Sequence, residues 1–522
     1  MSVDSQPTLA ATVTDGPDTR PAARTADVNG RREASGRRLP DWLEARALFI
    51  TTVAAVIVLS VAGIPSHLAQ DGYLALVAGR IIAAHGIPHH DYLTVMAYGV
   101  RWTDQQWLAQ LTMFGLQQLG GLQLLAVTYV AITGLAFALA IAAARQLGGR
   151  DVPILAMLPL GTFFYMVTAV TIRTQGFAYP LFVATLWLLA AETRCPSRRR
   201  WLLAFPMLVV WANLHGSVTL GVGMAVIYGV TLVASGYRSF GVRGLAAPRG
   251  LAFVFGAPLS LLATPYGLSI IHYYRVTLFN PGFAKLVTEW QPVTSYMLLA
   301  IPLLILILGI VWMLGRSGRR TPAFDQLVLG MLALGAIFAV RNITWFGLAV
   351  MVLAPVTISG LLNPAVPRPR RRRANLTLAS GSIVLAALAM VTALSRPTAW
   401  FQSTYPRRAV ATLQRLVTAR PDTKIFADVR FADWLIWEDP ALAGHVAYDT
   451  SLENLTDAQL QALSSLTAEP GPGVPNTLGP YSVLMLNPTP GNRHSNRILL
   501  ARPGVRVLTR SKQVLIATKP VI

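Results

Sequence analysis

Acidic side chains are scarce in the apolar part of this chain, so each one indicates a place where chemistry could occur. Asp71 directly follows an apolar stretch, in the sequence HLAQDGY at 67–73. A carboxylate partly withdrawn from water in this way can act as a base or hold a cation. Three other acidic residues lie beside arginines, where charge balance at a helix end explains them. Those three are Asp151, Glu192 and Asp325, and the remaining ones between 47 and 395 are Asp91, Asp104 and Glu289.

Two arginines, Arg173 and Arg341, each stand at the end of an apolar stretch, in a connection that contains no other basic residue. A planar guanidinium binds phosphate through two parallel hydrogen bonds, which suits it to the phosphate of an anionic lipid or a lipid-linked substrate. Snorkelling of the side chain to lipid headgroups explains the same positions. The sequence leaves both interpretations open.

Polar residues also stand where two further apolar stretches end. Gln175 follows Arg173 by two residues, and Asn213 and His215 fall in the sequence WANLHG at 211–216. Apolar lipid does not accept such a cluster, so these side chains should face protein or a water-filled cavity. A packed histidine and a substrate-binding histidine are both compatible with His215.

The outer segments contribute His90, Asp91 and Glu289 as further substrate-binding candidates. His89 and His90 are adjacent and lack a third donor at helical spacing, so the pattern does not favour a zinc site. The chain also contains no glycine-rich phosphate-binding motif. We therefore predict no cofactor and no metal site, although a divalent cation could assist a reaction at these carboxylates.

The elements that position these residues are membrane helices. Of 522 residues, 53% are hydrophobic and only 13% are charged, and the mean hydropathy is +0.50. These values are typical of a polytopic membrane protein. The net charge of +21 comes mostly from arginines in short runs between apolar stretches. Such runs set the topology of a membrane protein, so we exclude nucleic-acid binding.

Eleven apolar stretches predict about eleven transmembrane helices. Arginines gather in every second connection, which places the N-terminus in the cytoplasm and the C-terminus outside. The richness in alanine and arginine is typical of a bacterial protein, so we expect a multi-pass protein of the bacterial plasma membrane. The stretches are 47–64, 121–144, 152–171, 176–192, 201–214, 217–235, 251–271, 297–315, 325–340, 343–362 and 376–395.

Three regions follow from this pattern. Residues 1–46 are polar and arginine-rich, which predicts a disordered basic cytoplasmic tail. Residues 47–395 form the membrane region, with outer loops at about 65–120 and 266–296, and an amphipathic stretch at 107–119 predicts a helix at the interface. Residues 396–522 predict a small extracytoplasmic α/β domain, because alternating stretches at 424–429, 482–486, 505–508 and 513–517 accompany a helical stretch at 407–418.

Several short motifs resemble a known superfamily. The sequences QDGYLALVAGR at 70–80, GIPHHDY at 86–92 and WTDQQWL at 102–108 resemble the first outer loop of the GT-C superfamily. Its members are polytopic glycosyltransferases that use polyprenyl-phosphate sugars. The motifs RTQ at 173–175, WANLHG at 211–216, PYG at 265–267 and EWQP at 289–292 look like those of a bacterial branch that also ends in an outer soluble domain.

The resemblance implies an inverting sugar transfer outside the membrane, to an envelope glycan, lipid or protein. In the superfamily an Asp after the first span, often followed by Glu, is the proposed base. Asp71 matches this position, whereas Gly72 departs from it. Arg173 or Arg341 would stabilise the departing lipid phosphate. Asp91, His215 and Glu289 would orient acceptor or sugar.

Two other functions remain open from the sequence. A transporter or flippase of lipid-linked glycans usually places polar residues near the bilayer midplane and often shows inverted repeats, and neither pattern is evident here. A non-catalytic envelope scaffold would leave Asp71, Arg173, His215 and Arg341 without a shared role. Their convergence on one site would therefore favour the enzyme.

Overall fold

The computed structural model describes residues 39–68, 70–240, 246–280, 286–362, 371–467 and 478–519. Within these ranges eight helices are long and apolar enough to cross a membrane, and three shorter apolar helices accompany them. Each of the eleven predicted stretches overlaps one of them, although the stretch predicted at 251–271 extends too far, because α8 ends at Leu259. The long ones are α1 (Leu39–His67), α3 (Trp107–Gln146), α4 (Asp151–Ala169), α5 (Ala178–Arg194), α7 (Val218–Phe240), α11 (Met297–Ser317), α13 (Ile343–Leu361) and α14 (Arg372–Ser395), and the shorter ones are α6 (Ala204–Leu214), α8 (Ala246–Leu259) and α12 (Ala323–Phe338).

The predicted disordered tail extends too far, because α1 already begins at Leu39. Residues 39–46 are helical, and the guanidinium of Arg46 lies 4.7 Å from the ring centre of Trp42. Asp41 pairs with Arg372 of α14 at 3.0 Å. These contacts extend the first span beyond its apolar stretch. Residues 1–38 lie outside the described part of the chain.

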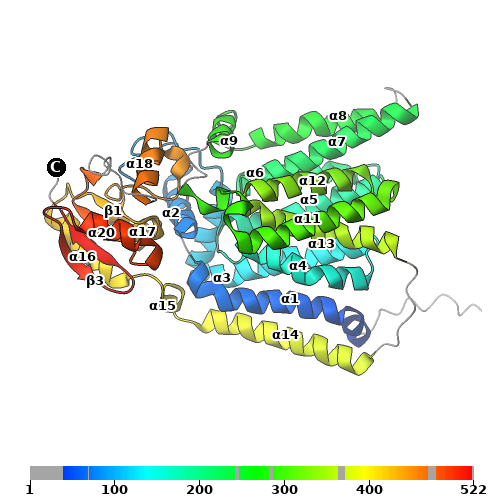
Figure 1. The fold of residues 1–522 in the computed structure, drawn as a ribbon, viewed down its shortest axis with the longest axis horizontal. Coiled ribbons are helices and arrows are strands. Elements are labelled where there is room, and N and C mark those ends of the chain that lie inside the picture. The colour runs from blue at the N-terminus through cyan, green and yellow to red at the C-terminus, as the bar shows by residue number, and fades with distance from the viewer. Residues whose placement is uncertain are drawn as a thin grey trace, which may run out of the picture.

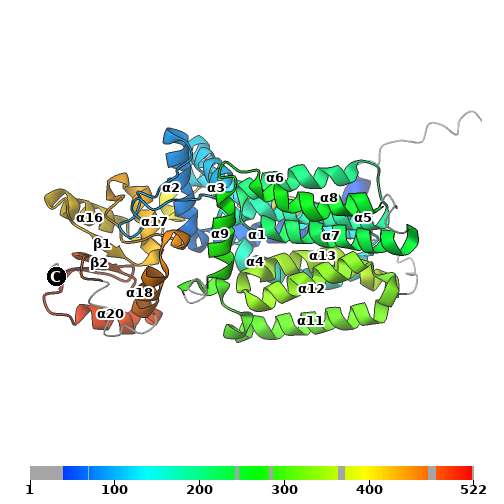
Figure 2. The ribbon, with the colours of Figure 1, turned by 90° about the horizontal axis from the view of Figure 1, so that it is seen from above.

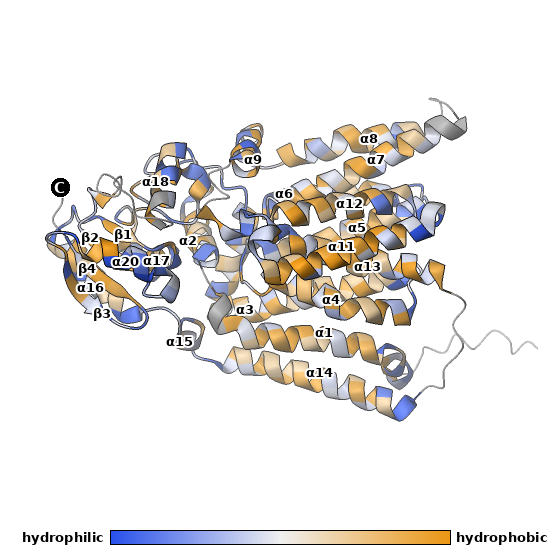
Figure 3. Ribbon diagram, in the orientation of Figure 1, coloured by the Kyte–Doolittle hydropathy of each residue, from blue (hydrophilic) through white to orange (hydrophobic). Residues whose placement is uncertain are grey.

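The apolar helices run side by side in one bundle (Figure 1), and apolar residues cover their lengths (Figure 3). Helix α13 forms the centre of this bundle, and most of its side chains are buried. Its sequence is apolar on every side, as expected for a helix surrounded by other helices. The aromatic rings of Tyr179, Phe182 and Trp211 pack around Trp345 of α13.

Helices α1 and α14 form a pair along one edge of the bundle (Figure 1). The Ser382 hydroxyl of α14 donates to Thr51 Oγ1 of α1 at 2.9 Å. Much of α14 faces outward, with Val384 65% and Leu388 60% exposed. An exposed face of this kind is suited to lipid.

The two ends of the bundle differ in chemistry. One end, here called the basic end, carries most of the arginines that lie between the spans, among them Arg194, Arg200, Arg249, Arg316, Arg320 and Arg372. The other end, the site end, carries α2 (Gln70–His85), which runs across the bundle axis (Figure 2). The start of α3 also lies at the site end. Its backbone leaves the helical conformation at Gly120 and Gly121, so residues 107–119 take a different direction from the span that follows.

Beyond the site end lies a four-stranded sheet with helices around it. The strands β1 (Ile425–Ala427), β2 (Val483–Leu486), β3 (Arg506–Arg510) and β4 (Leu515–Thr518) agree with the predicted alternating stretches. Their order is β1-β2-β4-β3, with β1 and β2 parallel and the other pairs antiparallel. The helices are α15 (Thr398–Phe401), α16 (Arg407–Ala419), α17 (Val429–Glu438), α18 (Asp457–Thr467) and α20 (Arg493–Leu500).

The first outer loop joins this sheet. Val95 and Met96 donate backbone hydrogen bonds to Val446 and Ala447, and residue 446 in turn bridges to Ile425 of β1. On the other side, Arg80 of α2 donates to the carbonyl of Ile436 at the end of α17 at 2.9 Å. A single buried apolar cluster then continues from α2 and α3 into the C-terminal part. The packing therefore joins residues on both sides of the boundary predicted at 396.

Candidate active site

Asp71 lies in the first turn of α2 at the site end. A carboxylate is favourable there because the first turn of a helix presents unpaired amide groups. The backbone just before it is supported by the C-terminal part, since the Tyr405 hydroxyl donates to the Leu68 carbonyl at 3.3 Å and the Tyr405 ring packs edge-on against Tyr73. Gln70 has φ of +24°, a left-handed value that is uncommon for a residue other than glycine. The position of Asp71 is thus set by contacts from distant residues.

Arg173 connects Asp71 to a second carboxylate. It is extended between α4 and the short helix η2 (Thr174–Phe177), and its side chain is 8% exposed. Its Nη1 lies 2.8 Å from Glu289 Oε2 and 3.5 Å from Asp71 Oδ2. Glu289 comes from η6 (Thr288–Trp290), in the second outer loop. The structure therefore brings together three residues that the sequence analysis proposed separately.

Gly72 has a steric reason to be glycine. A Cβ atom at this position would lie 2.4 Å from the backbone carbonyl oxygen of Ile172, next to Arg173. Any side chain here would push α2 away from the arginine, because the obstacle is backbone rather than a flexible side chain. An acid after Asp71 has no room, and Glu289 supplies the second carboxylate from another part of the chain.

Arg341 completes the charged group. It lies in η9 (Val340–Asn342), with its guanidinium 4.5 Å from the ring centre of Trp290. The Val340 amide donates to the Gln291 carbonyl at 3.1 Å, which holds η9 against the Glu289 loop. Arg341 is close enough for its positive charge to lower the pKa of both Asp71 and Glu289.

The pKa values of Asp71 and Glu289 are shifted in opposite directions. The side chain of Asp71 is 44% exposed, so it is only partly withdrawn from water; this withdrawal raises its pKa, and Arg173 opposes the rise only in part. Burial also acts to raise the pKa of Glu289, but the charge of Arg173 outweighs it, so that pKa is lowered. The pKa of Arg173 would fall through burial, but Glu289 and Asp71 raise it above its usual value. A pair of acids whose pKa values are separated in this way suits acid–base chemistry, with Asp71 as the more basic group.

Arg173 has donor nitrogens that its two carboxylate partners do not use. Its Nε and Nη2 atoms are buried and have no hydrogen-bond partner among the described residues, and the same holds for the side-chain amide of Gln175. Buried donors of this kind are normally paired in a folded protein. Their arrangement beside two carboxylates fits a ligand that brings acceptor oxygens, such as a phosphate or a sugar hydroxyl.

His215 lies nearby and is neutral. Burial lowers its pKa well below the usual value, and the charges of Arg341 and Arg173 lower it further. Its Nδ1 accepts a hydrogen bond from the Ser217 amide at 3.0 Å. The proton must then sit on Nε2, which makes that nitrogen a hydrogen-bond donor.

The side chain of Asn213 joins separate segments of the chain through hydrogen bonds. Its Oδ1 accepts from Trp107 Nε1 at 2.8 Å, and its Nδ2 donates to the Ala263 carbonyl at 2.8 Å. It thereby ties the start of α3 to α6 and to the end of the α8 segment. A substrate would have to displace one of these bonds to reach the side chain.

His90 and Asp91 lie away from Asp71 and Arg173. His90 is exposed and pairs through its backbone with Arg101. Asp91 is fully buried, where it accepts from the Leu93 amide at 2.8 Å and from Asn454 Nδ2 at 3.0 Å. Asp91 thus holds the first outer loop against the C-terminal part.

Trp290 and Tyr405 belong to the site although neither is among the residues predicted for it. Trp290 stacks on Arg341, and its place next to Glu289 was a signal that could have indicated it. Tyr405 gave no such signal, because it lies more than three hundred residues from the Leu68 carbonyl that it contacts. Within the described residues no group of three or more His, Cys, Asp or Glu side chains is arranged to hold a metal ion.

Comparison with known proteins bears on the fold. No protein-family model matches the sequence, and no curated protein matches it. Among solved structures, the oligosaccharyltransferase of Archaeoglobus fulgidus is similar with a TM-score of 0.50 and 11% identity, over 85% of this chain and 70% of that one. ArnT from Cupriavidus metallidurans, solved in the apo state and with undecaprenyl phosphate, has a TM-score of 0.48 and 16% identity, over 90% of this chain and 97% of that one.

Both proteins are GT-C superfamily membrane glycosyltransferases. The likeness to the oligosaccharyltransferase confirms the GT-C fold expected from the motifs. At this level of identity it concerns the arrangement of the helices, and the chemistry has to be argued from the residues themselves.

Proposed function

We propose that this protein is a membrane glycosyltransferase that moves a sugar from a polyprenyl-phosphate-linked donor to an acceptor outside the cytoplasmic membrane. The basic end would face the cytoplasm, in accordance with the positive-inside rule, and the site end would face outward. We expect it in the plasma membrane of a bacterium. Its partners would be the lipid-linked donor and an envelope glycan, lipid or protein acceptor.

One observation carries this proposal: the contact of Arg173 with both Asp71 and Glu289, with Arg341 beside them. Glu289 keeps Arg173 charged and in place, while Nε and Nη2 of Arg173 remain for a ligand. The raised pKa of Asp71 makes it the stronger base of the two acids. A base and a phosphate-binding cation that both reach one sugar ring are what a single displacement at a sugar phosphate requires, with the acceptor and the phosphate on opposite faces of the anomeric carbon.

The transfer would be one inverting step. The acceptor oxygen forms a bond to the anomeric carbon while its proton passes to Asp71. The bond between that carbon and the phosphate oxygen breaks, and the electron pair leaves with the phosphate. Arg341 and the free nitrogens of Arg173 stabilise the charge that develops there. Gln175, or the Nε2–H group of His215, would orient the sugar or the acceptor.

A transporter is the second candidate, and the position of the charges disfavours it. The charged residues of the site lie at one end of the bundle: Asp71, Arg173, Glu289 and Arg341. Transporters, in contrast, usually place their sites near the midplane of the membrane. A scaffold is disfavoured for a different reason, because it gives no role to unpaired donors on a buried arginine.

Binding of undecaprenyl phosphate, the product side of the reaction, tests the phosphate site without knowledge of the sugar. We expect the full chain in nanodiscs to bind it. Arg341→Gln should weaken binding on the order of tenfold, as the loss of a charge-assisted hydrogen bond does. The matched control is Arg275→Gln, which removes an exposed arginine at the same end and should leave binding unchanged.

A turnover assay tests whether Asp71 is the base. We expect release of polyprenyl phosphate from at least one member of a panel of polyprenyl-phosphate sugars, with membrane extract as the acceptor. Asp71→Asn should abolish this release while it keeps or strengthens the binding of undecaprenyl phosphate, because it removes a negative charge. Equal turnover by Asp71→Asn and the unaltered chain would exclude Asp71 as the base.

A further inference from the structure

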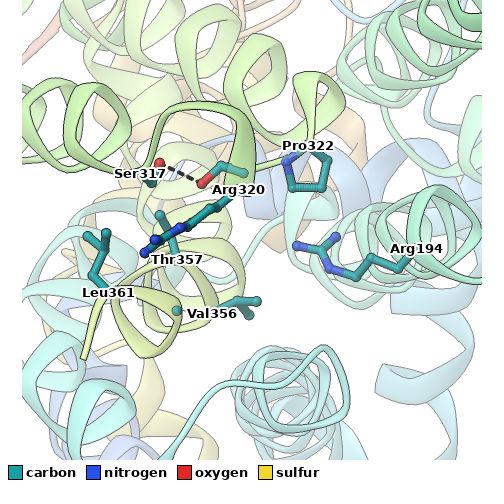
Figure 4. A pocket seen from close by; sticks show the side chains of 9 residues that line it. Arg194, Ser317, Arg320, Pro322, Val356, Thr357 and Leu361 are labelled. Atoms are coloured by element: carbon teal, nitrogen blue, oxygen red, sulfur yellow. Dashed lines mark hydrogen bonds between the residues drawn. The ribbon is translucent and has the colours of Figure 1, made fainter. Parts of the chain in front are cut away.

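A cavity lies at the basic end of the bundle, where the helices α5, α11, α12 and α13 meet. It has a volume of about 170 Å³. Arg194 and Arg320 both line it, and the Arg320 side chain extends past Thr357 toward Leu361 (Figure 4). Arg194 ends α5, and Arg173 precedes the same helix, so about 25 Å of helix separates this cavity from the site end. The transfer chemistry proposed above makes no use of it.

Arg194 is held firmly at the edge of the cavity. Its Nη2 lies 2.5 Å from Asp325 Oδ2, its Nη1 donates to the Ala190 carbonyl at 3.0 Å, and its side chain is 20% exposed. Asp325 is fully buried, so one of its roles is to fix this guanidinium. The carboxylate of Glu192, at the same end, is already paired with Arg200 at 2.7 Å.

Arg320 differs from Arg194. It is exposed, and within the described ranges no carboxylate pairs with it, although it lines the cavity. Because Asp325 neutralises Arg194, the charge of Arg320 leaves the cavity with a net positive charge. Such a cavity attracts an anion.

The start of a helix at the cavity favours a phosphate as the anion. The hydroxyls of Ser317 and Thr357 also belong to the lining residues, but they already donate to the carbonyls of Leu314 at 3.0 Å and Leu353 at 3.3 Å. Helix α12 begins beside them at Ala323, and among the described residues no side chain caps its first amides. A helix start with free amides favours negative charge.

We propose that this cavity binds the phosphate group of an anionic phospholipid from the leaflet at the basic end. Basic cavities between membrane helices on this side of a membrane are suited to anionic headgroups. The surroundings fit a lipid, because exposed apolar side chains lie along the same helices: Leu308 and Trp312 of α11 are 67% and 70% exposed, and Leu327 of α12 is 50% exposed. Acyl chains would rest on these faces while the headgroup enters the cavity that Arg194 and Arg320 line.

Native mass spectrometry of the full chain in detergent, with phosphatidylglycerol or phosphatidylcholine of the same acyl chains, tests this site. We expect phosphatidylglycerol to bind and Arg320→Gln to weaken that binding on the order of tenfold. Arg316→Gln is the matched control, because it removes an exposed arginine from the last turn of α11 that does not line the cavity. Its affinity should stay within about twofold of the unaltered chain.

A second variant blocks the cavity without changing charge or fold. A Cβ atom at Gly360 would meet nothing within 4 Å, and Gly360 lines the cavity. Gly360→Leu should therefore fold normally, fill the space and lose phosphatidylglycerol as Arg320→Gln does. If Arg320→Gln, Gly360→Leu and Arg316→Gln all bind phosphatidylglycerol like the unaltered chain, the site does not exist.

Inorganic phosphate distinguishes a lipid from a soluble phosphate compound. We expect millimolar phosphate neither to displace phosphatidylglycerol nor to raise the melting temperature of lipid-depleted protein. A rise that depends on Arg320 and occurs without lipid would overturn the lipid assignment in favour of a soluble phosphate. Equal binding of phosphatidylcholine and phosphatidylglycerol would overturn the requirement for an anionic headgroup.

Discussion

Arg173 determines the properties of its neighbours at the scale of single residues. One of its nitrogens contacts both Glu289 and Asp71, but at different distances, 2.8 Å and 3.5 Å. The closer acid is the one whose pKa is lowered, and the more distant one keeps a raised pKa. An arginine that lies closer to one acid than to the other therefore separates the pKa values of the two acids.

The variant Glu289→Gln tests this coupling. The negative charge of Glu289 contributes to the raised pKa of Asp71, so its removal should lower that pKa. Activity requires ionised Asp71 and falls as pH drops through its pKa. The acid limb of the pH–rate profile for sugar transfer should therefore move to lower pH, and the maximal rate should decrease because Asp71 becomes a weaker base. An acid limb that stays in place or moves upward contradicts the coupling.

The contact at Gly72 makes a prediction about stability. Gly72→Ala should lower the free energy of unfolding by about 1–3 kcal/mol, because the new methyl group meets the Ile172 carbonyl. Gly309→Ala, in a part of α11 where a Cβ atom meets nothing within 4 Å, should be neutral or slightly stabilising. Thermal unfolding of the two variants in the same detergent measures the difference. If both variants melt alike, α2 is not held closely against Ile172.

At the scale of elements, the kink in α3 makes residues 107–119 a helix separate from the span. Gly121 has φ of +68° and ψ of −171°, a region almost restricted to glycine. The kink lets Trp107 reach Asn213, while the span continues through the bundle. It is therefore needed for the geometry of the site end.

Gly121→Ala should strain or straighten this kink, at a cost of about 1–3 kcal/mol. We expect a lower melting temperature together with a loss of transfer activity, since the start of α3 would shift. Gly115→Ala, where a Cβ atom meets nothing within 4 Å, provides the comparison and should retain both. Full activity of Gly121→Ala would show that the kink is not required.

The elements themselves could largely be predicted from the sequence. Apolar length identified all eleven helices of the bundle, and alternation identified the four strands. The sheet order β1-β2-β4-β3 and the pairing of residues 95–96 with 446–447 could not be predicted, because they depend on contacts between distant segments. For the same reason the sequence proposed Asp71, Arg173, Glu289 and Arg341 as candidates, but their mutual distances came only from the structure.

At the scale of the whole molecule, buried carboxylates lie where the first outer loop meets the C-terminal part. Asp449 is 3% exposed, and burial followed by the charge of Asp91 raises its pKa to about 7. Asp104 is likewise 3% exposed, and burial raises its pKa to about 7. Charging these groups opposes the packing between the two parts.

Because the pKa of Asp449 is raised in the folded protein, the stability of the protein should decrease as pH rises. The folded protein favours the protonated form of Asp449, so the stability that this group contributes is full below its unfolded pKa of about 4 and is lost as pH rises toward about 7. Asp449→Asn removes the titration, so its melting temperature should exceed that of the unaltered chain at pH 8 and approach it at pH 5.

Exposed Asp422→Asn serves as the control, and it should follow the unaltered chain at every pH. Melting temperatures in one detergent at pH 5, 6, 7 and 8 provide the measurement. A variant Asp449→Asn that melts lower than the unaltered chain at pH 8 would contradict the assignment of a buried, protonated carboxyl.

The pairing of α1 with α14 has a consequence for how the protein is made. Helix α1 leaves the ribosome before the other spans, whereas α14 follows them all, yet the two lie against each other through Thr51 with Ser382 and Asp41 with Arg372. During synthesis α1 must therefore wait in the bilayer with its partner surface facing lipid or the insertion machinery. The edge of the bundle closes only when the last span arrives, so a chain interrupted before residue 372 should remain open along α1 and become a substrate for membrane quality control.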